Sequence, residues 1–573
     1  MAIEQTDFRG TMRSVRRLTP ILILLSATLN LLLLVGAIYM LQVYDRVLTS
    51  GSHDTLIWLT AIAVFAIAVY AVVERSRRII LSRAAFWLDR ELTAPAIRRR
   101  MEARLAGTPS QAGPREVADL RNFYRSDAVM ALYDAPWGAI FILFIWALHP
   151  VLGMIALGGA GFLFGLSLLN DLLTRKQQRE AMQAVHGAND LAIRYVDAGE
   201  TIRPLGMGAT LFERWQNRAA IAHGREAALQ ERTSTIVSIS RGIRLALQVM
   251  ILGAGAFLVL RGDVTAGAMI AASITLGRAL SPIERLTAAW RQLQAARVAH
   301  SALEAALKEG DHAPRLALHR PNGALALEGV HFAVPGSSER ILKNIGFAIE
   351  PGTCLAIVGP SGAGKSSLCR LLVGAWAPSA GHVRLDGADV FSWDPDELGR
   401  HIGYLPQRVD LFPGTIAENI ARFGKMESEA VMAAAEAAGV HKLILRFPKG
   451  YDTVIDPTGE QISLGQRQRI GLARALYGGP SFVVLDEPNS NLDREGEECL
   501  HNAIAALKKA SATVVVVSHR ASILKLADLV LTMSEGQVEQ FGKKGSKPQV
   551  VTETREVGAV RGPRVRVAQV SHP

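Results

Sequence analysis

Residues 359–366 read Gly-Pro-Ser-Gly-Ala-Gly-Lys-Ser and stand between the apolar run Cys354–Val358 and a helix-forming stretch that begins Ser367-Leu368. This spacing of glycines, lysine and serine, placed between a strand and a helix, is that of a P-loop. The glycines allow the backbone to curl so that its N–H groups and the helix N-terminus meet phosphate oxygens. Lys365 then reaches the terminal phosphates, and the Ser366 hydroxyl ligates Mg²⁺. The residues predicted to contact the nucleotide in this loop are Gly359, Pro360, Ser361, Gly362, Ala363, Gly364, Lys365, Ser366 and Ser367.

Two further apolar runs end in polar residues that suit phosphate chemistry. Phe482–Leu485 is followed by Asp486 and Glu487, and Thr513–Val517 is followed two residues later by His519. The first carboxylate is predicted to hold the Mg²⁺ shell, and the second to orient and deprotonate water as the general base. The histidine is placed to contact the γ-phosphate or the attacking water. Each feature alone has a plainer explanation, since strand ends are often polar, but together and in this order they predict an ATPase site.

The chain around these motifs alternates strand-like and helical runs, which is the pattern of an α/β domain. The expected strands are 324–332, 354–358, 382–385, 482–485 and 513–517. Three cysteines occur, all in this half, and their spacing fits neither a metal site nor a disulfide framework. We therefore expect reduced cysteines that serve packing.

The first 300 residues have a different composition. The whole chain of 573 residues is 49% hydrophobic and 20% charged, with a mean hydropathy of +0.20, and its longest apolar runs crowd the N-terminal half. About twenty apolar residues are needed to cross a bilayer. Six spans are predicted near residues 18–41, 55–74, 128–147, 150–172, 242–261 and 264–284.

Charged residues near these runs indicate the orientation of the spans. The net charge is +11, and much of the arginine excess lies beside the apolar runs, for example after residue 74, whereas the connections at 45–54, 149–150 and 261–263 are short. Arginine beside a span sets membrane orientation, so we expect both termini in the cytoplasm and no nucleic-acid partner. The long polar segments after the second and fourth spans are expected to project into the cytoplasm as helices. Arg278 interrupts the sixth run and is expected to face a cavity or to lie below the membrane.

The predicted organisation is therefore multidomain, with an all-α six-helix transmembrane domain followed by an α/β P-loop ATPase domain. The predicted boundaries are 1–17 for a cytoplasmic N-terminus, 18–300 for the membrane domain, 301–321 for a linker, 322–545 for the ATPase domain and 546–573 for a disordered tail. Fewer than about twenty residues precede the first span, too few for a folded processing domain.

These motifs resemble those of the ABC transporter family. Tyr404-Leu-Pro-Gln407 looks like the Q-loop, the stretch that begins Ile462-Ser-Leu-Gly-Gln466 looks like the signature motif, and Ser490-Asn-Leu-Asp493 resembles the D-loop. His519 resembles the switch histidine. In that family two ATPase domains sandwich two ATP molecules, each held by one subunit's P-loop and the other's signature, so one ATPase domain per chain implies a homodimer.

The resemblance assigns roles to individual residues. It adds Ser463, Gly465 and Gln466 to the ATP-binding set and Gln407 to both the Mg²⁺ ligands and the catalytic set. The Mg²⁺ ligands are then Ser366, Gln407 and Asp486, and the catalytic residues are Glu487, His519 and Gln407.

Two positions depart from the family pattern. Leu464 replaces the first of the two usual glycines of the signature, and Val334 stands where an aromatic residue usually stacks on adenine. Phe332 is two residues out of register and is expected to point into the core. Nucleotide binding should be weaker, because the aromatic stacking that Val334 does not provide contributes about 1 kcal/mol. ATPase activity should persist at a reduced level, because backbone donation at the signature does not depend on the side chain at position 464.

Three local tracts look like type I protein-secretion exporters of the PrtD kind, over about residues 16–541. They are Leu132–Trp137, Ala266–Ser273 with Gly277–Pro282, and Asp486–Asp493. The first also reads as a helix start with proline in its first turn, and the second as small residues that pack membrane helices closely. Asn489, in the third tract, has no evident packing reason and favours the secretion family.

That resemblance implies a bacterial inner-membrane exporter of unfolded proteins with C-terminal signals, acting with a periplasmic adaptor protein and a TolC-like outer-membrane channel and surrounded by membrane lipids. A lipid, drug or small-amphiphile half-transporter of the same architecture is the main alternative. A soluble ABC ATPase that acts on nucleic acid would require the first 300 residues not to be membranous. Residues 196–207 resemble the loop that docks on the ATPase domain near Gln407, although a helix break at Gly199 and Pro204 explains them too.

Overall fold

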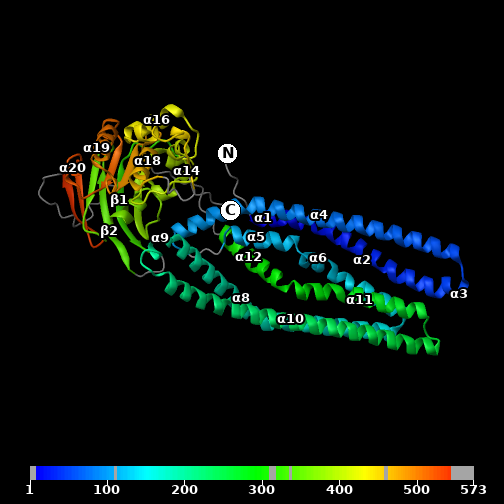
Figure 1. Cartoon of the computed structure of the whole chain (residues 1–573). Coiled ribbons are helices and arrows are strands. Elements are labelled where there is room, and N and C mark those ends of the chain that lie inside the picture. Colours follow the sequence, from blue (N-terminus) through cyan, green and yellow to red (C-terminus); the bar gives the residue numbers. More distant parts are fainter. Residues whose placement is uncertain (1–7, 109–111, 309–317, 335–338, 457–461, 544–573) are drawn as a thin grey trace, which may run out of the picture. The chain divides into compact units, whose positions relative to one another are not determined.

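The computed structural model describes residues 8–108, 112–308, 318–334, 339–456 and 462–543 (Figure 1). The chain divides into two compact units, one of Met1–Met101 with Ser110–Asp311 and the other of Glu102–Pro109 with His312–Pro573. The predicted tail 546–573, residues 309–317 of the predicted linker and residues 1–7 lie outside the described residues, and the domain boundaries stay predictions.

The N-terminal unit is helical. Its elements are α1 (Phe8–Arg16), α2 (Thr19–Gln42), the π-helix η1 (Val43–Val47), α3 (Leu48–Ser50), α4 (His53–Leu105), α5 (Pro114–Arg125), α6 (Asp127–Asp134), the 3₁₀ turn η2 (Ala135–Trp137), α7 (Gly138–Leu148), α8 (Pro150–Asp197), α9 (Gly199–Ile202), α10 (Gly208–Arg261), α11 (Ala266–Ala288) and α12 (Trp290–Lys308).

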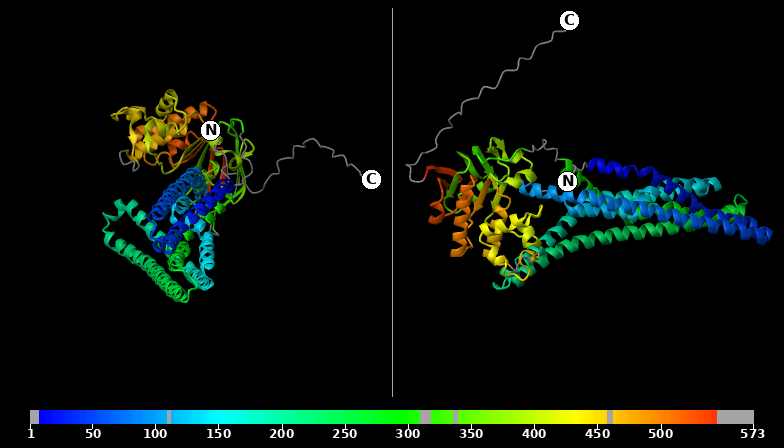
Figure 2. Two further views of the ribbon diagram at one scale, coloured as in Figure 1. Left: turned by 90° about the vertical axis from the view of Figure 1, so that its right-hand side faces the viewer. Right: turned by 90° about the horizontal axis from the view of Figure 1, so that it is seen from above.

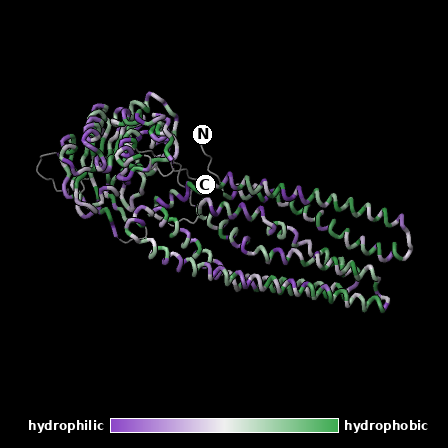
Figure 3. The backbone as a smooth tube through the Cα atoms, in the orientation of Figure 1, coloured by the Kyte–Doolittle hydropathy of each residue, from purple (hydrophilic) through white to green (hydrophobic). Residues whose placement is uncertain are grey.

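Six helical segments among the described residues are long and apolar enough to cross a membrane, which confirms the six predicted spans. They are Phe8–Ser50, His53–Leu105, Asp127–Leu148, Pro150–Asn170, Gly208–Arg261 and Ala266–Ala288. Figure 3 shows the apolar stretches of these helices and the polar continuations of the longest ones.

Three helices extend far beyond a membrane span. α4 has 53 residues, α8 has 48 and α10 has 54. Their polar parts are rich in good helix formers and poor in turn formers, so nothing in the sequence stops the helix where the apolar run ends. α8 and α10 lie side by side along much of their length (Figure 2). Between these two helices, α8 ends at Asp197 and the short α9 follows, so the long helix is interrupted in the region where Gly199 and Pro204 predict a break. Docking of this loop on the ATPase domain stays a prediction.

Short turns and caps join the spans at their other ends. Gly51 and Gly262 adopt left-handed conformations with φ of 66° and 80°, which end α3 and α10. Thr265 caps α11 by accepting a hydrogen bond from the backbone of Ala268. The small residues of Ala266–Ser273 are largely buried, which supports their role in close helix packing.

The tract around Asp134 departs from the predicted helix start. α6 ends at Asp134, a 3₁₀ turn covers Ala135–Trp137, and α7 begins only at Gly138. A proline lacks the backbone N–H of the α-helical ladder, so the third span is built from two helices with a tighter turn between them.

The C-terminal unit is an α/β domain, as predicted. Its strands are β1 (Leu325–Ala333), β2 (Arg340–Ile349), β3 (Cys354–Val358), β4 (Ala380–Leu385), β5 (Ala388–Asp389), β6 (Ile402–Leu405), β7 (Gly414–Thr415), β8 (Val454–Ile455), β9 (Phe482–Asp486), β10 (Thr513–Val517), β11 (Leu529–Ser534) and β12 (Gln537–Lys543). Its helices are α13 (Lys365–Leu372), η3 (Val390–Ser392), α14 (Pro395–His401), α15 (Ile416–Ile420), α16 (Ser428–Ala437), α17 (His441–Ile444), η4 (Gly450–Asp452), α18 (Leu464–Leu476), α19 (Arg494–Lys509) and α20 (Ala521–Leu524).

A six-stranded sheet in the order β12-β11-β3-β10-β9-β6 forms the centre of this unit, and every neighbouring pair in it is parallel except β11 with β12. Strands β9 and β10 are buried at every position, which explains their unbroken apolar sequence. A separate antiparallel sheet has the order β2-β1-β4-β5. Because β3, β10 and β9 are neighbours, the loops that leave their carboxyl ends meet at one edge of the sheet.

Candidate ATPase site

The P-loop leaves β3 and curls tightly before α13. Gly359, Gly362 and Gly364 have φ angles of 152°, 82° and 92°, which favour glycine. A Cβ at Gly359 would lie 2.2 Å from the carbonyl oxygen of Met533, so a side chain does not fit there. The backbone therefore curls at the predicted glycines, and phosphate binding by this loop stays a prediction.

Lys365 begins α13 and is buried within the loop. Its ammonium donates hydrogen bonds to the carbonyl oxygens of Gly359, at 2.6 Å, and Pro360, at 2.8 Å. These contacts hold the cation inside the curve of the P-loop, which suits a lysine that meets phosphate oxygens.

Asp486, the last residue of β9, has the surroundings of a metal ligand. Its side chain is 1% exposed, and among the described residues its Oδ1 has no hydrogen-bond partner. Burial raises the pKa of this carboxyl, the neighbouring Glu487 raises it further, and a hydrogen bond from Ser366 lowers it. A buried carboxylate oxygen without a partner beside a serine hydroxyl fits Mg²⁺, which prefers oxygen ligands.

Glu487 is held at several points of its backbone and side chain. Its φ of 48° is unusual for a residue with a side chain, and its N–H donates to the carbonyl of Val517 at 3.1 Å. Gln468 Nε2 reaches the carbonyls of Glu487 at 3.4 Å and Pro488 at 3.2 Å. Gln407 Nε2 donates to Glu487 Oε2 at 3.0 Å. The structure thus brings the predicted Q-loop glutamine to the predicted base, and it fixes the direction of the carboxylate.

The loop after β10 is less tightly joined to the site. His519 is exposed, and no hydrogen bond among the described residues connects it with the other predicted site residues. The preceding Ser518 donates from its hydroxyl to Asn489 Oδ1 at 3.1 Å and accepts from the backbone N–H of Arg520 at 3.2 Å. Asn489 therefore does have a packing reason: it links the segment after Glu487 to the end of β10.

The signature residues lie at the start of α18. Ser463 and Gln466 form a capping box, in which the Gln466 N–H donates to Ser463 Oγ at 3.3 Å and the Ser463 N–H donates to Gln466 Oε1 at 3.0 Å. In the described parts of the chain, no hydrogen bond joins Ser463, Gly465 or Gln466 to the P-loop. Their predicted contact with ATP stays a prediction.

The two positions where the signature usually has glycines, Leu464 and Gly465, have different surroundings. The Leu464 side chain is 65% exposed, so its own chain accommodates it without a steric conflict. A Cβ at Gly465, in contrast, would lie 2.8 Å from the carbonyl oxygen of Asn491. Arg469 of α18 also pairs with Asp493, the N-cap of α19. The signature helix therefore packs directly on the D-loop of the same chain.

The buried position of Phe332, in the core of the C-terminal unit, confirms the expectation that this residue points into the core. This side chain is 5% exposed and stacks on Trp376 with ring centroids 4.9 Å apart and an interplanar angle of 14°. The guanidinium of Arg370 lies 4.5 Å from the centre of the Trp376 ring. Val334 is 44% exposed, so this position offers an aliphatic surface only.

Fold and site together define an ABC-type ATPase domain joined to a six-span membrane domain, the class of ABC exporters. The ABC transporter family profile matches residues 342–490. Among solved structures, the chain is similar to a bacterial Atm1-family ABC exporter with ATP bound, with a TM-score of 0.78, 20% identity and coverage of 93% of this chain and 95% of that one.

The chain belongs to the family of type I secretion ATP-binding proteins. It is 42% identical over 527 residues to the type I secretion system ATP-binding protein PrsD of Rhizobium meliloti (strain 1021), which covers 91% of this chain and 90% of that protein. It is 29% identical over 535 residues to the alpha-hemolysin translocation ATP-binding protein HlyB of Escherichia coli, covering 91% and 75%. The chain is thus an ATPase-coupled protein exporter and a multi-pass membrane protein.

Proposed function

We propose that this chain is the ATP-hydrolysing inner-membrane subunit of a type I secretion system. It acts as a homodimer with a periplasmic adaptor and a TolC-like outer-membrane channel, has both termini in the cytoplasm, and moves unfolded proteins with C-terminal signals out of the cell. The observation that carries the proposal is the pair of carboxylates at the end of β9. Asp486 has a buried Oδ1 without a hydrogen-bond partner among the described residues, and Glu487 accepts a hydrogen bond from Gln407. They stand in a chain with a type I secretion relative over nine-tenths of its length.

The residues of the site divide the chemistry among themselves. Ser366, Gln407 and Asp486 would hold Mg²⁺, which offsets the charge that develops on the phosphates. Lys365 and the curled backbone of the P-loop bind the phosphates. Glu487 orients the attacking water and takes its proton, and its fixed backbone means that little reorganisation is needed when the reaction occurs.

A second copy of the chain would complete each site. The capped start of α18 presents Ser463 and the exposed Leu464 without hydrogen bonds to its own P-loop among the described residues, which supports a role toward the partner's nucleotide. The helix N-terminus and the serine hydroxyl can donate to phosphate whatever side chain occupies position 464.

Glu487→Gln tests the assignment of the base. The amide keeps the shape of the side chain but does not accept the proton, so ATP hydrolysis should fall by about 10²-fold or more while ATP binding persists. The matched control is Glu495→Gln, the same change at an exposed position in the first turn of α19, which should hydrolyse ATP at the wild-type rate. Turnover near that of wild type in Glu487→Gln would remove Glu487 as the base.

Crosslinking in intact cells tests the cargo. Recovery of a secreted polypeptide together with an adaptor protein is the expected outcome. An ATPase rate that responds to drugs or other amphiphiles, with no response to a secreted polypeptide, would contradict protein cargo and favour the half-transporter alternative.

A further inference from the structure

A polar cavity of about 110 Å³ lies inside the helical unit, among α2, α4, the end of α6 and α11. Its volume has room for several water-sized groups. The charged residues that line it are Glu74, Arg77, Arg78, Asp134, Arg278 and Arg285. Four guanidinium groups therefore face two carboxylates, and the cavity carries an excess of positive charge.

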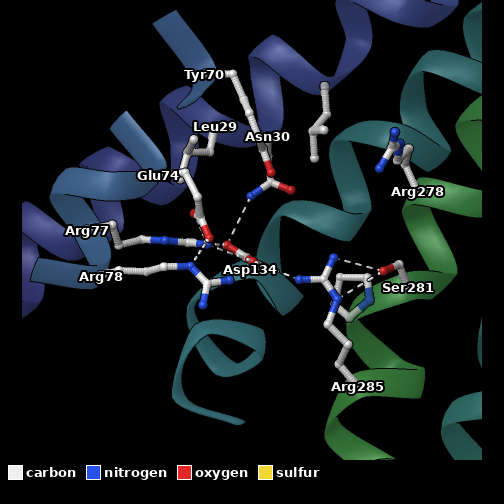
Figure 4. Close-up of a pocket in the computed structure, with 12 residues that line it drawn as sticks. Leu29, Asn30, Tyr70, Glu74, Arg77, Arg78, Asp134, Arg278, Ser281 and Arg285 are labelled. Atoms are coloured by element: carbon white, nitrogen blue, oxygen red, sulfur yellow. Dashed lines mark hydrogen bonds and ion pairs between the residues drawn. The ribbon is translucent and has the colours of Figure 1, made fainter. Parts of the chain in front are cut away.

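One ion-pair cluster forms the wall of the cavity (Figure 4). Arg77 Nη1 lies 2.6 Å from Asp134 Oδ1 and 2.9 Å from Ser26 Oγ, and Arg77 Nη2 lies 2.7 Å from Glu74 Oε2. Arg78 Nε donates to Glu74 Oε1 at 2.9 Å. The Arg77 side chain is 4% exposed, and in the part of the chain that the structure describes its Nε has no hydrogen-bond partner. The carboxylates of Glu74 and Asp134 are thus both paired with arginines of α4.

The two arginines of α11 supply the excess charge. Arg285 donates to Ser281 Oγ at 2.9 Å and lies 3.8 Å from Asp134 Oδ2, a weak pairing with a carboxylate that Arg77 already occupies. Arg278 makes no hydrogen bond or ion pair with any described residue, and Figure 4 shows it apart from the dashed network. This arginine does line a cavity, as the sequence suggested.

An apolar groove adjoins the cavity along α4. The groove has a volume of about 620 Å³, and Tyr70, Glu74 and Arg78 line both it and the cavity. Further along the same helix, Ile62 and Phe65 are 62% and 72% exposed. A cationic cavity that opens beside an apolar helix face matches a molecule with an anionic head and an apolar tail.

The cavity lies at the level where lipid head groups are expected. Tyr70 and Glu74 follow the short turn at Gly51-Ser52 by about twenty residues, and Arg285 follows Thr265 by a similar number; Arg278 follows Thr265 by thirteen residues and lies about two helical turns deeper in the membrane than Arg285. At 1.5 Å per residue, about twenty residues span roughly 30 Å, the thickness of the hydrocarbon core. The cavity therefore meets the membrane boundary opposite the short turns.

We propose that this cavity binds the phosphate of an anionic phospholipid, with Arg278 and Arg285 as its principal contacts and an acyl chain in the groove of α4. Binding requires neither ATP nor cargo. A failure of the lipid test therefore leaves the proposed secretion function in place, and a failure of the Glu487→Gln test leaves the lipid site in place.

Short-chain phospholipids test the proposal on the purified full-length chain in neutral detergent. Native mass spectrometry would compare dioctanoyl phosphatidylglycerol with dioctanoyl phosphatidylcholine, which has the same tails and no net charge. The anionic lipid should bind more tightly, and Arg278→Gln and Arg285→Gln should each weaken it about fivefold, the effect of one basic residue near a charged membrane surface. Arg46→Gln, the same change at an exposed position on η1, should leave binding unchanged.

Four results would overturn the proposal. The first is equal binding of the two lipids by the wild-type chain, and the second is an equal loss in Arg46→Gln. The third is displacement of the lipid by glycerol 3-phosphate at equal concentration, which would make a free phosphate the ligand. Arg278→Lys keeps the charge and should retain most of the affinity. A loss as large as that of Arg278→Gln would show that packing and not charge had changed, and would also contradict the proposal.

Discussion

Asp134→Asn removes one charge from the buried cluster of the membrane domain while it keeps the size and shape of the side chain. Asp134 is 6% exposed and accepts from Arg77 at 2.6 Å, from Ser26 at 3.0 Å and from Asn30 at 3.4 Å. In the variant, Arg77 keeps Glu74 as its only carboxylate partner among the described residues.

The expected cost follows from burial. Removal of one member of a buried ion pair costs about 3–5 kcal/mol, because the other charge stays out of water without its partner. Glu74 still pairs with the Arg77 guanidinium, so we expect the free energy of unfolding to fall by about 3 kcal/mol, the lower end of this range. At a few degrees per kcal/mol this lowers the unfolding midpoint of the helical unit by roughly 6–10 °C.

Thermal unfolding in detergent, followed by tryptophan fluorescence, measures this change. Asp127→Asn is the matched control: its side chain is 70% exposed and lies 3.6 Å from Arg78, so the pair should contribute less than about 1 kcal/mol. A double-mutant cycle with Arg77→Gln should give a coupling of about 1.5–3 kcal/mol between Asp134 and Arg77. A coupling near zero, or equal midpoints for the two Asp→Asn variants, would refute the reasoning.

Three further changes probe the ATPase unit. Gly465→Ala should cost about 1–3 kcal/mol of stability and lower ATP turnover, because its Cβ would push on the D-loop backbone, whereas the exposed Leu464→Ala should stay close to wild type in thermal unfolding. Equal melting of these two variants would argue against the close contact. Asn489→Ala removes the bond to the end of β10, so stability should fall by about 1 kcal/mol and ATP turnover several-fold; a variant unchanged in both assays would show that the bond does not matter. Burial raises the pKa of Cys354 to about 11, so at pH 8 about one thiol in a thousand is ionised, and maleimide should label it far more slowly than the partly exposed Cys499. Equal labelling rates in the native protein would contradict this.

The ATPase site could be predicted largely from the sequence because its residues are set by local spacing. The P-loop follows β3, Asp486 ends β9, and both are fixed by the order of short segments along the chain. Their meeting also follows, since parallel strands bring their carboxyl ends to one edge. The contact between Gln407 and Glu487 joins residues 80 positions apart, and the family resemblance supplied it.

Pairing in the membrane domain could not be predicted in the same way. The arginines after the second span indicated orientation, but nothing local showed that Arg77 turns inward to Asp134, 57 residues away on another helix. The sequence offered one indication for the membrane domain, which is that a charged residue is costly to bury in lipid. This argument predicted that Arg278 faces a cavity or lies below the membrane. The hydrogen bond of Asn489 was missed for a similar reason, because its partner Ser518 follows a different strand.

The length of α10 has a mechanical consequence. This helix runs without an internal proline from Gly208 to Arg261, which at 1.5 Å per residue is about 80 Å. A tilt of about 5° would displace one tip relative to the other by roughly 7 Å, more than one turn of helix. The helix can therefore act as a lever arm. A small rotation at Gly208 becomes a large lateral displacement of the other end, at the far side of the bilayer, because no proline kink interrupts the helix between the two ends.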